Sequence, residues 1–333
     1  MRATQPAITN QARMVNWVQV VREHFVARLA TNAGLRQHVV AVDDEAGTGT
    51  VLSFWLPEHK IIARSGATAA DQREKHTTSR HAVVLLHGFA GDGLMTWGFQ
   101  VGALAGCGYD VYVPDLVHFG GSTSQSPDRS VAFQARCLAA ALRKLGVGEG
   151  CTVVGFSYGG FVAFEMAAAH QALVGSVVVS GADVAYTSAM NDAMLERFGA
   201  GTLAELLLPE SVARLRSLFS DAMYKKLWFP ERLLSDFLKV MYANRQERKE
   251  MLEKLVMMDK QESAPVFQQN ILMLWGEDDD FFPIENAKML KEKLGEKAML
   301  RSISKAGHLA QLERPCVYNH CLKEFLATIS PEP

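Results

Sequence analysis

A serine stands between two glycines in the segment 155–159, Gly-Phe-Ser-Tyr-Gly, which follows the apolar run Cys151–Val154 and precedes Gly160–Met166. Glycines on both sides of a serine at a strand-to-helix junction predict a sharp turn, because neighbouring backbone passes too close to admit a Cβ atom. Such a turn exposes the hydroxyl of Ser157 and aims the backbone N–H of Tyr158 at the group that the hydroxyl attacks. The segment therefore predicts a nucleophilic serine.

His308 is the histidine best placed to activate that serine. A serine hydroxyl is a weak nucleophile at neutral pH and needs a base, usually a histidine oriented by a carboxylate. His308 comes just after the last expected strand, and Gly307 lets its loop turn so that the imidazole reaches back over Ser157. His87 and His118 also follow expected strands, and we interpret both as structural.

The orienting carboxylate is expected in the acidic run that follows the buried segment 270–275. We choose Asp279, with its neighbours Asp278 and Asp280 as the alternatives. The chain order Ser, Asp, His is the one expected on a parallel α/β sheet. Asp115 also ends a strand, and we interpret it as fixing a loop rather than taking part in chemistry.

Acyl chemistry also needs donors for the oxyanion that forms on the attacked carbonyl, each contributing about 3 kcal/mol. The segment 87–91, His-Gly-Phe-Ala-Gly, follows the apolar run Ala82–Leu86 directly. We expect the backbone N–H of Phe89 to join that of Tyr158 as the oxyanion hole.

The composition is that of a globular protein with an ample core. Of 333 residues, 48% are hydrophobic and 21% charged, and a formal net charge of −2 gives no reason to expect a nucleic acid partner. There is no H-E-x-x-H, no Cys/His cluster, no phosphate-binding G-x-x-x-x-G-K-[ST] loop and no dinucleotide fingerprint, so no metal and no cofactor is expected. Five scattered cysteines indicate reduced thiols and a cytoplasmic location.

The N-terminal segment 1–34 contains a helix of its own, because apolar residues between Met14 and Ala30 recur at three- and four-residue spacing. We expect this helix to pack on the body of the protein. Peripheral contact with a membrane surface is the second possibility, although the polar face is not basic. No run is long enough to span a membrane. The first acid is Glu23, so import into an organelle also stays open.

Strands that alternate with helices predict an α/β fold with a doubly wound, mostly parallel sheet. A helical insertion, 183–265, interrupts this alternation and is expected to form a cap over the strand ends. The α/β core would then comprise 35–182 and 266–333. The expected strands are 36–42, 50–56, 82–86, 111–113, 151–154, 174–180, 270–275 and 298–303.

Together these motifs resemble the α/β-hydrolase fold superfamily over roughly Thr50 to Ile329. The resemblance rests on His87-Gly88-Phe89, the loop 115–122, Gly155–Gly160, the segment 276–283 and Gly307-His308. More narrowly, the segments 133–137, 155–161 and 275–279 are similar to plant hydrolases labelled monoacylglycerol-lipase-like or esterase-like. The resemblance implies a Ser157-Asp279-His308 triad with Phe89 and Tyr158 as oxyanion donors. A serine nucleophile, rather than aspartate, argues against epoxide hydrolases and haloalkane dehalogenases.

The sequence thus predicts a serine hydrolase that cleaves a small, apolar carboxylic ester through an acyl-enzyme. Phe281 and Phe282, with the Met and Phe residues of the cap, favour an apolar acyl or alcohol group. Two alternatives stay open. One is carbon–carbon bond hydrolysis or cyanohydrin lysis by the same triad, and the other is a small-molecule receptor with residual hydrolase activity.

Overall fold

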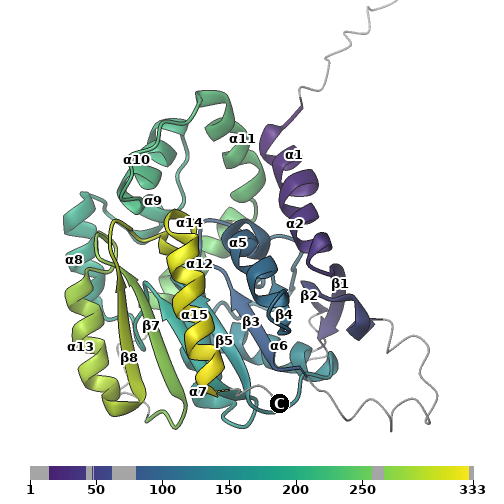
Figure 1. Cartoon of the computed structure of the whole chain (residues 1–333). Coiled ribbons are helices and arrows are strands. Elements are labelled where there is room, and N and C mark those ends of the chain that lie inside the picture. The colour runs from purple at the N-terminus through teal and green to yellow at the C-terminus, as the bar shows by residue number, and fades with distance from the viewer. Residues whose placement is uncertain (1–14, 43–46, 48, 62–79, 257–265, 330–333) are drawn as a thin grey trace, which may run out of the picture.

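A single sheet with the strand order β1-β2-β4-β3-β5-β6-β7-β8 forms the centre of the computed structural model, which describes residues 15–42, 47, 49–61, 80–256 and 266–329 (Figure 1). Strands β3 to β8 are parallel, whereas β2 pairs antiparallel with both the edge strand β1 and β4. The expected fold class is confirmed. The strands are β1 (Leu35–Val42), β2 (Thr50–Pro57), β3 (Ala82–Leu86), β4 (Asp110–Pro114), β5 (Cys151–Phe156), β6 (Val174–Ser180), β7 (Asn270–Gly276) and β8 (Ala298–Ile303).

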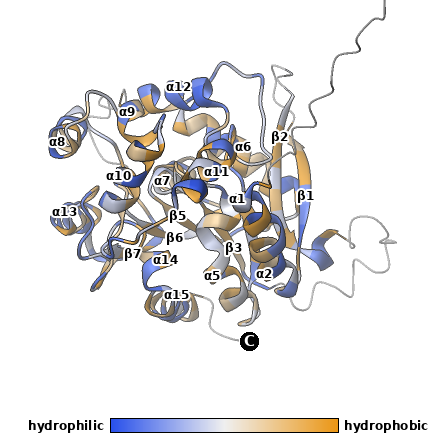
Figure 2. Ribbon diagram, turned by 90° about the horizontal axis from the view of Figure 1, so that it is seen from above, coloured by the Kyte–Doolittle hydropathy of each residue, from blue (hydrophilic) through white to orange (hydrophobic). Residues whose placement is uncertain are grey.

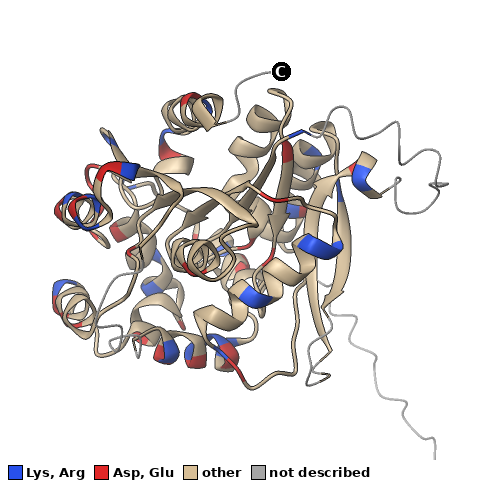
Figure 3. Cartoon of the chain, turned by 90° about the horizontal axis from the view of Figure 1, so that it is seen from below, with Lys and Arg blue, Asp and Glu red and all other residues tan. Residues whose placement is uncertain are grey.

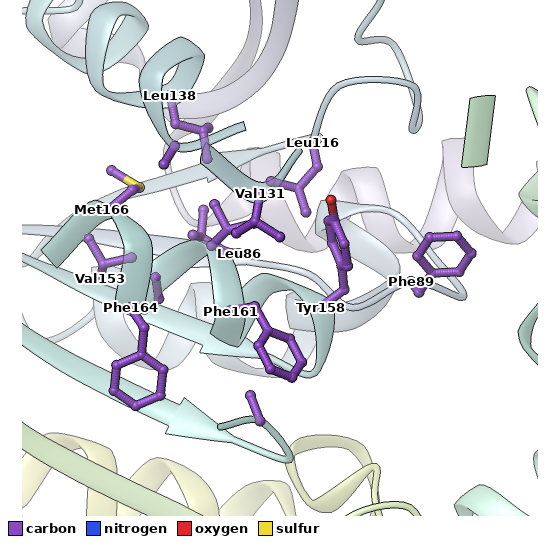
Figure 4. Packing of buried hydrophobic residues seen from close by; sticks show 14 of the residues in the cluster. Leu86, Phe89, Leu116, Val131, Leu138, Val153, Tyr158, Phe161, Phe164 and Met166 are labelled. Atoms are coloured by element: carbon purple, nitrogen blue, oxygen red, sulfur yellow. The ribbon is translucent and has the colours of Figure 1, made fainter. Parts of the chain in front are cut away.

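The central strands are buried on both faces, because helices cover each side of the sheet. Leu85 packs in one hydrophobic cluster with Trp97 and Tyr318, whereas its neighbour Leu86 packs in the other with Met166 (Figure 4). Successive strand side chains point to opposite faces, so a continuous apolar run is what such a strand requires. The helices that pack on the sheet are α5 (Gly93–Ala105), α6 (Val131–Lys144), α7 (Tyr158–Ala169), α13 (Ile284–Leu294) and α15 (Pro315–Ile329).

Five helices lie in the described part of the segment between β6 and β7, and they stand over one end of the sheet (Figure 1). They are α8 (Ser188–Phe198), α9 (Leu203–Leu207), α10 (Val212–Ala222), α11 (Glu231–Met241) and α12 (Arg245–Val256). Three of them begin at a hydroxyl residue whose side chain accepts a hydrogen bond from a first-turn N–H, at Thr187, Thr202 and Ser211. The division of the chain into core and cap stays a prediction, and the last part of the proposed cap, 257–265, lies outside the described residues.

The N-terminal helical segment packs against the body, as expected, along one narrow face. It comprises α1 (Trp17–Val20), the π-helical turn η1 (Val21–Val26) and α2 (Ala27–Asn32). Val18 and Ala30 are buried. The N–H of Trp17 donates to the buried carboxylate of Asp236 on α11, at 3.0 Å. The segment therefore joins the sheet side of the molecule to the helices above it, and α1 lies beside α11 (Figure 1).

Polar and charged residues are spread over the outer helices. Seen from above, the outer helix α12 is largely hydrophilic (Figure 2). Basic and acidic residues both occur on the outer helices (Figure 3). No helix of the described residues is both long and apolar enough to cross a membrane.

Candidate active site

Ser157 sits at the end of β5 with a strained backbone, φ 51° and ψ −121°. A non-glycine residue rarely adopts a positive φ, and it does so here because the surrounding chain leaves no alternative. A Cβ at Gly155 would lie 2.3 Å from the carbonyl oxygen of Gly159, and one at Gly159 would lie 2.5 Å from that of His87. Both flanking positions therefore require glycine, for the reason that the sequence pattern suggested.

Two backbone N–H groups beside Ser157 are free to bind a ligand. Tyr158 is the first residue of α7, so its N–H has no partner within the helix. Among the hydrogen bonds of the described residues, neither the N–H of Tyr158 nor that of Phe89 is a donor. Both residues line the same cavity as Ser157, and their rings meet edge to face at 5.7 Å. The structure thus places the two expected oxyanion donors together.

The imidazole of His308 is held by Asp279, which follows β7. Nδ1 of His308 lies 2.9 Å from Oδ2 of Asp279. The other oxygen of that carboxylate, Oδ1, accepts hydrogen bonds from the N–H groups of Phe281 and Phe282, both at 2.9 Å. Asp279 is buried, whereas the alternatives that the sequence left open, Asp278 and Asp280, are both exposed. Because all its partners are donors, the carboxylate fixes the His308 tautomer with the proton on Nδ1 and leaves Nε2 free as a base.

Aromatic rings and a glycine fix the plane of the His308 ring. The ring stacks on Phe282 with an interplanar angle of 19°, and Phe281 and Phe156 lie 5.0 Å and 4.8 Å away between centroids. Gly181, directly after β6, has a φ of +59°, and a Cβ there would lie 2.5 Å from Cε1 of His308. This glycine was not singled out from the sequence, although its place at the end of the strand beside β5 is the signal that would have found it.

Ser157 and His308 both line the cavity but are not hydrogen-bonded to each other. In the part of the chain that the structure describes, the Ser157 hydroxyl makes no side-chain hydrogen bond, and His308 bonds through Nδ1 alone. Catalytic hydrogen bonds are often long without substrate and tighten when it binds.

The loop that carries Phe89 is fixed by His87, which is fully buried. Its Nδ1 lies 2.7 Å from the carbonyl oxygen of Gly88, and its Nε2 accepts from the N–H of Leu116 at 3.0 Å. One ring nitrogen donates and the other accepts, so the imidazole is neutral. Burial lowers the pKa of His87 to about 4. These contacts agree with a structural role and leave no nitrogen for proton transfer.

Asp115 fixes a loop with its carboxylate, and His118 does so with its carbonyl oxygen, which accepts from the side chains of Asn244 at 3.1 Å and Arg248 at 3.2 Å. Among the described residues, neither is hydrogen-bonded to Ser157. The Asp115 carboxylate accepts from the N–H groups of Gly93 and Gly121, and burial, reinforced by nearby Asp92, raises its pKa to about 7. Burial, with Arg129, lowers the pKa of His118 to about 4. No group of three metal-ligating side chains occurs among the residues that the structure describes.

Glu313 is a structural residue of the site that the sequence analysis missed. Its carboxylate accepts from the N–H of Gly307, next to His308, at 2.7 Å. It also accepts from the N–H groups of Tyr224 and Lys225, in the loop after α10, at 3.1 Å and 3.0 Å. One side chain of the short helix α14 (Ala310–Glu313) thus joins the histidine loop to the helices above the sheet. No local pattern reveals such a long-range bridge.

A cavity of about 420 Å³ connects these groups, and its walls come from three parts of the chain. The loops after the strands contribute Ser157, Phe89 and His308, and the N-terminal helical segment contributes Val18 and Val21. The helices between β6 and β7 contribute apolar side chains such as Leu218, Phe237 and Leu255. The lining contains no Lys, Arg, Asp or Glu from the described residues. Such a surface favours an uncharged, apolar ligand.

Known proteins share this architecture. The family model of the alpha/beta hydrolase fold matches residues 81–315. A 2-hydroxy-6-oxononadienedioate/2-hydroxy-6-oxononatrienedioate hydrolase of Burkholderia vietnamiensis is 29% identical over 258 residues, which cover 75% of this chain and 88% of that protein. Lipase 3 of a Moraxella species is 26% identical over 245 residues, or 72% and 75% of the two chains. The crystal structure of a bacterial membrane phospholipase A superposes with a TM-score of 0.67 at 20% identity, covering 95% of this chain and 96% of that one, a likeness that concerns the fold alone.

The neutral state of His87 predicts a pH-dependent contribution to stability. The ordinary pKa of 6.5 falls to about 4 on folding, so the unfolded chain binds more protons between these values. Stability from this residue is complete above about pH 6.5 and is lost as the pH falls toward 4. We therefore expect His87→Gln to lower the free energy of unfolding by about 1–3 kcal/mol at pH 7.5.

That difference should narrow between pH 6.5 and 4 in urea titrations of the two proteins. His118 titrates in both the wild type and the variant, so its contribution cancels in the difference between their free energies of unfolding. A difference that stays constant with pH would show that His87 is not buried in its neutral form.

Proposed function

We propose that this chain, which belongs to the α/β hydrolase fold family, is a carboxylic ester hydrolase with Ser157 as its nucleophile. The observation that carries the proposal is the convergence of three features on one apolar cavity. These are the serine hydroxyl that lines the cavity, the His308–Asp279 pair, and the unpaired N–H groups of Phe89 and Tyr158.

In this mechanism, the Ser157 oxygen attacks the ester carbonyl while Nε2 of His308 accepts the hydroxyl proton. Asp279 stabilises the resulting imidazolium through Nδ1, as its 2.9 Å contact allows. The N–H groups of Phe89 and Tyr158 bind the oxyanion. His308 then donates its proton to the departing alcohol, which leaves an acyl group on Ser157. Water, deprotonated by His308, attacks the acyl carbonyl. His308 then returns the proton to the Ser157 oxygen as the acyl–oxygen bond breaks, which releases the acid and restores the serine.

The cavity favours an ester with an apolar acyl or alcohol group. Its polar lining residues beyond Ser157 and His308 are few, chiefly Thr96 and Gln311, and they carry no charge. Each methylene that the cavity takes out of water contributes about 0.8 kcal/mol. Substrate preference should therefore rise with chain length until the cavity is full.

Carbon–carbon bond hydrolysis is the second candidate, because proteins named as 2-hydroxy-6-oxo-dienoate and dienedioate hydrolases are among the relatives. The substrates in those names carry carboxylates. A carboxylate bound in an apolar cavity needs a cation or several donors. The described lining has no Lys or Arg, and this favours the neutral ester.

A series of p-nitrophenyl esters from acetate to octanoate tests the proposal. We expect kcat/KM to increase roughly fourfold for each added methylene over the short members, from the transfer free energy of each group. A 2-hydroxy-6-oxo-dienoate is the matched competitor. Turnover of that diketone acid with no turnover of any ester would overturn the ester proposal in favour of the second candidate.

The acidic run after β7 supplies a matched set of variants. Asp279→Asn keeps an oxygen for the N–H groups of Phe281 and Phe282 but presents an amide N–H to Nδ1 of His308, which forces the wrong tautomer. We expect kcat on the best ester to fall by about 10³- to 10⁴-fold. Asp278→Asn and Asp280→Asn change exposed carboxylates and should stay within about threefold of the wild type. An equal loss in all three variants would contradict the role of Asp279.

A further inference from the structure

Large apolar side chains are exposed on the loop that links α10 to α11, residues 223–230. Trp228 is 77% exposed, and Leu227 and Tyr224 are 54% and 41% exposed. The same loop contributes Met223 and Phe229 to the cavity wall. The loop thus carries side chains of the cavity wall next to exposed apolar ones.

The N-terminal helical segment presents a second set of exposed apolar side chains. Trp17, Val21 and Phe25 follow one another at four-residue spacing and are 55%, 38% and 71% exposed. Val21 also lines the cavity, together with the buried Val18. A helix that packs only on the body of a protein would place polar residues on these outer positions.

Hydrogen bonds hold the N-terminal helix against α11, the helix into which the loop leads. Arg232, just after the loop, donates to the carbonyl oxygen of Val15 at 2.8 Å, and the N–H of Trp17 donates to Asp236 at 3.0 Å. At the other end of the loop, Glu313 accepts from Tyr224 and Lys225. We call the exposed side chains Trp17, Val21, Phe25, Tyr224, Leu227 and Trp228 the apolar rim.

Positive charge accompanies the apolar rim. Lys225 and Lys226 are both exposed and stand between Tyr224 and Leu227 in the chain. Trp and Tyr prefer the boundary between water and lipid, and Lys side chains extend from apolar surroundings toward anionic headgroups. The ammonium of Lys226 donates to the carbonyl oxygen of Ser220, and both lysines remain exposed. A second protein surface would not need exposed cations beside aromatic tips, whereas an anionic lipid surface matches both.

We propose that the apolar rim docks the protein on an anionic lipid surface, with Lys225 and Lys226 at the headgroups and Trp228, Leu227 and Phe25 in the acyl boundary. Val21, Met223 and Phe229 place the cavity directly behind this surface. An apolar molecule dissolved in the lipid can then enter the cavity without crossing water. The docking is independent of the esterase proposal, because it is measured without substrate turnover.

Sedimentation of the full chain with lipid vesicles tests the docking. We expect binding to vesicles of phosphatidylcholine with phosphatidylglycerol, and at least tenfold weaker binding to phosphatidylcholine alone. The double variant Leu227→Ser/Trp228→Ala should weaken binding at least tenfold. Lys225→Glu/Lys226→Glu should abolish the preference for anionic vesicles, and this preference should also fall with added salt.

Met289→Ser on α13 is the matched control, because Met289 is 53% exposed but lies outside the apolar rim. It should bind as the wild type does, and so should Ser157→Ala. Thermal unfolding of each variant checks that the fold is kept, which we expect because the substituted side chains are exposed. The proposal is overturned if the wild type does not sediment with anionic vesicles, or if the Leu227/Trp228 variant binds as well as the control. It is equally overturned if the apolar rim holds two copies of the chain together. In that case sedimentation velocity would show a dimer that the Leu227/Trp228 variant dissociates and that vesicles leave intact.

Discussion

One carboxylate, that of Asp279, joins two loops whose contacting residues are 29 positions apart in the chain. Its first oxygen is fixed by the N–H groups of Phe281 and Phe282, so the second can point only toward His308. This restricts the imidazole to one tautomer and one ring plane, and Phe282 and Gly181 leave it little space to turn. The proposed chemistry depends on this restriction, because an imidazole free to rotate would not present Nε2 to the serine.

The backbone at the end of β5 imposes a complementary constraint. The positive φ of Ser157 is maintained by close approaches that only glycine allows, at Gly155 and Gly159. The same turn starts α7, and thereby leaves the N–H of Tyr158 unpaired at the edge of the cavity. Strain in the backbone and an unsatisfied donor both carry a cost in stability, and they occur together where a ligand would bind.

The sheet was predictable from sequence because parallel strands buried on both faces are continuous apolar runs. The bounds of β3 and β6, two such strands, agree with expectation to the residue. Elements without a continuous apolar run gave no comparable signal in the sequence. The helices α13 and α14 and the π-helical turn at Val21–Val26 were therefore not anticipated. Candidate site residues could be chosen because glycines and strand ends mark them. The bridge formed by Glu313, and the part that Val18 and Val21 play in the cavity wall, depend on contacts between distant segments and have no local pattern.

The central claim is that the Ser157 hydroxyl is chemically activated, and a fluorophosphonate probe measures this directly, since it reacts with activated serines whatever their substrate. After incubation and digestion, peptide mass spectrometry should find one phosphonylated residue, Ser157. The adduct should be absent in Ser157→Ala and should form far more slowly in His308→Ala. A folded wild-type protein that forms no adduct, or one that carries the adduct on another residue when Ser157 is intact, would contradict the account.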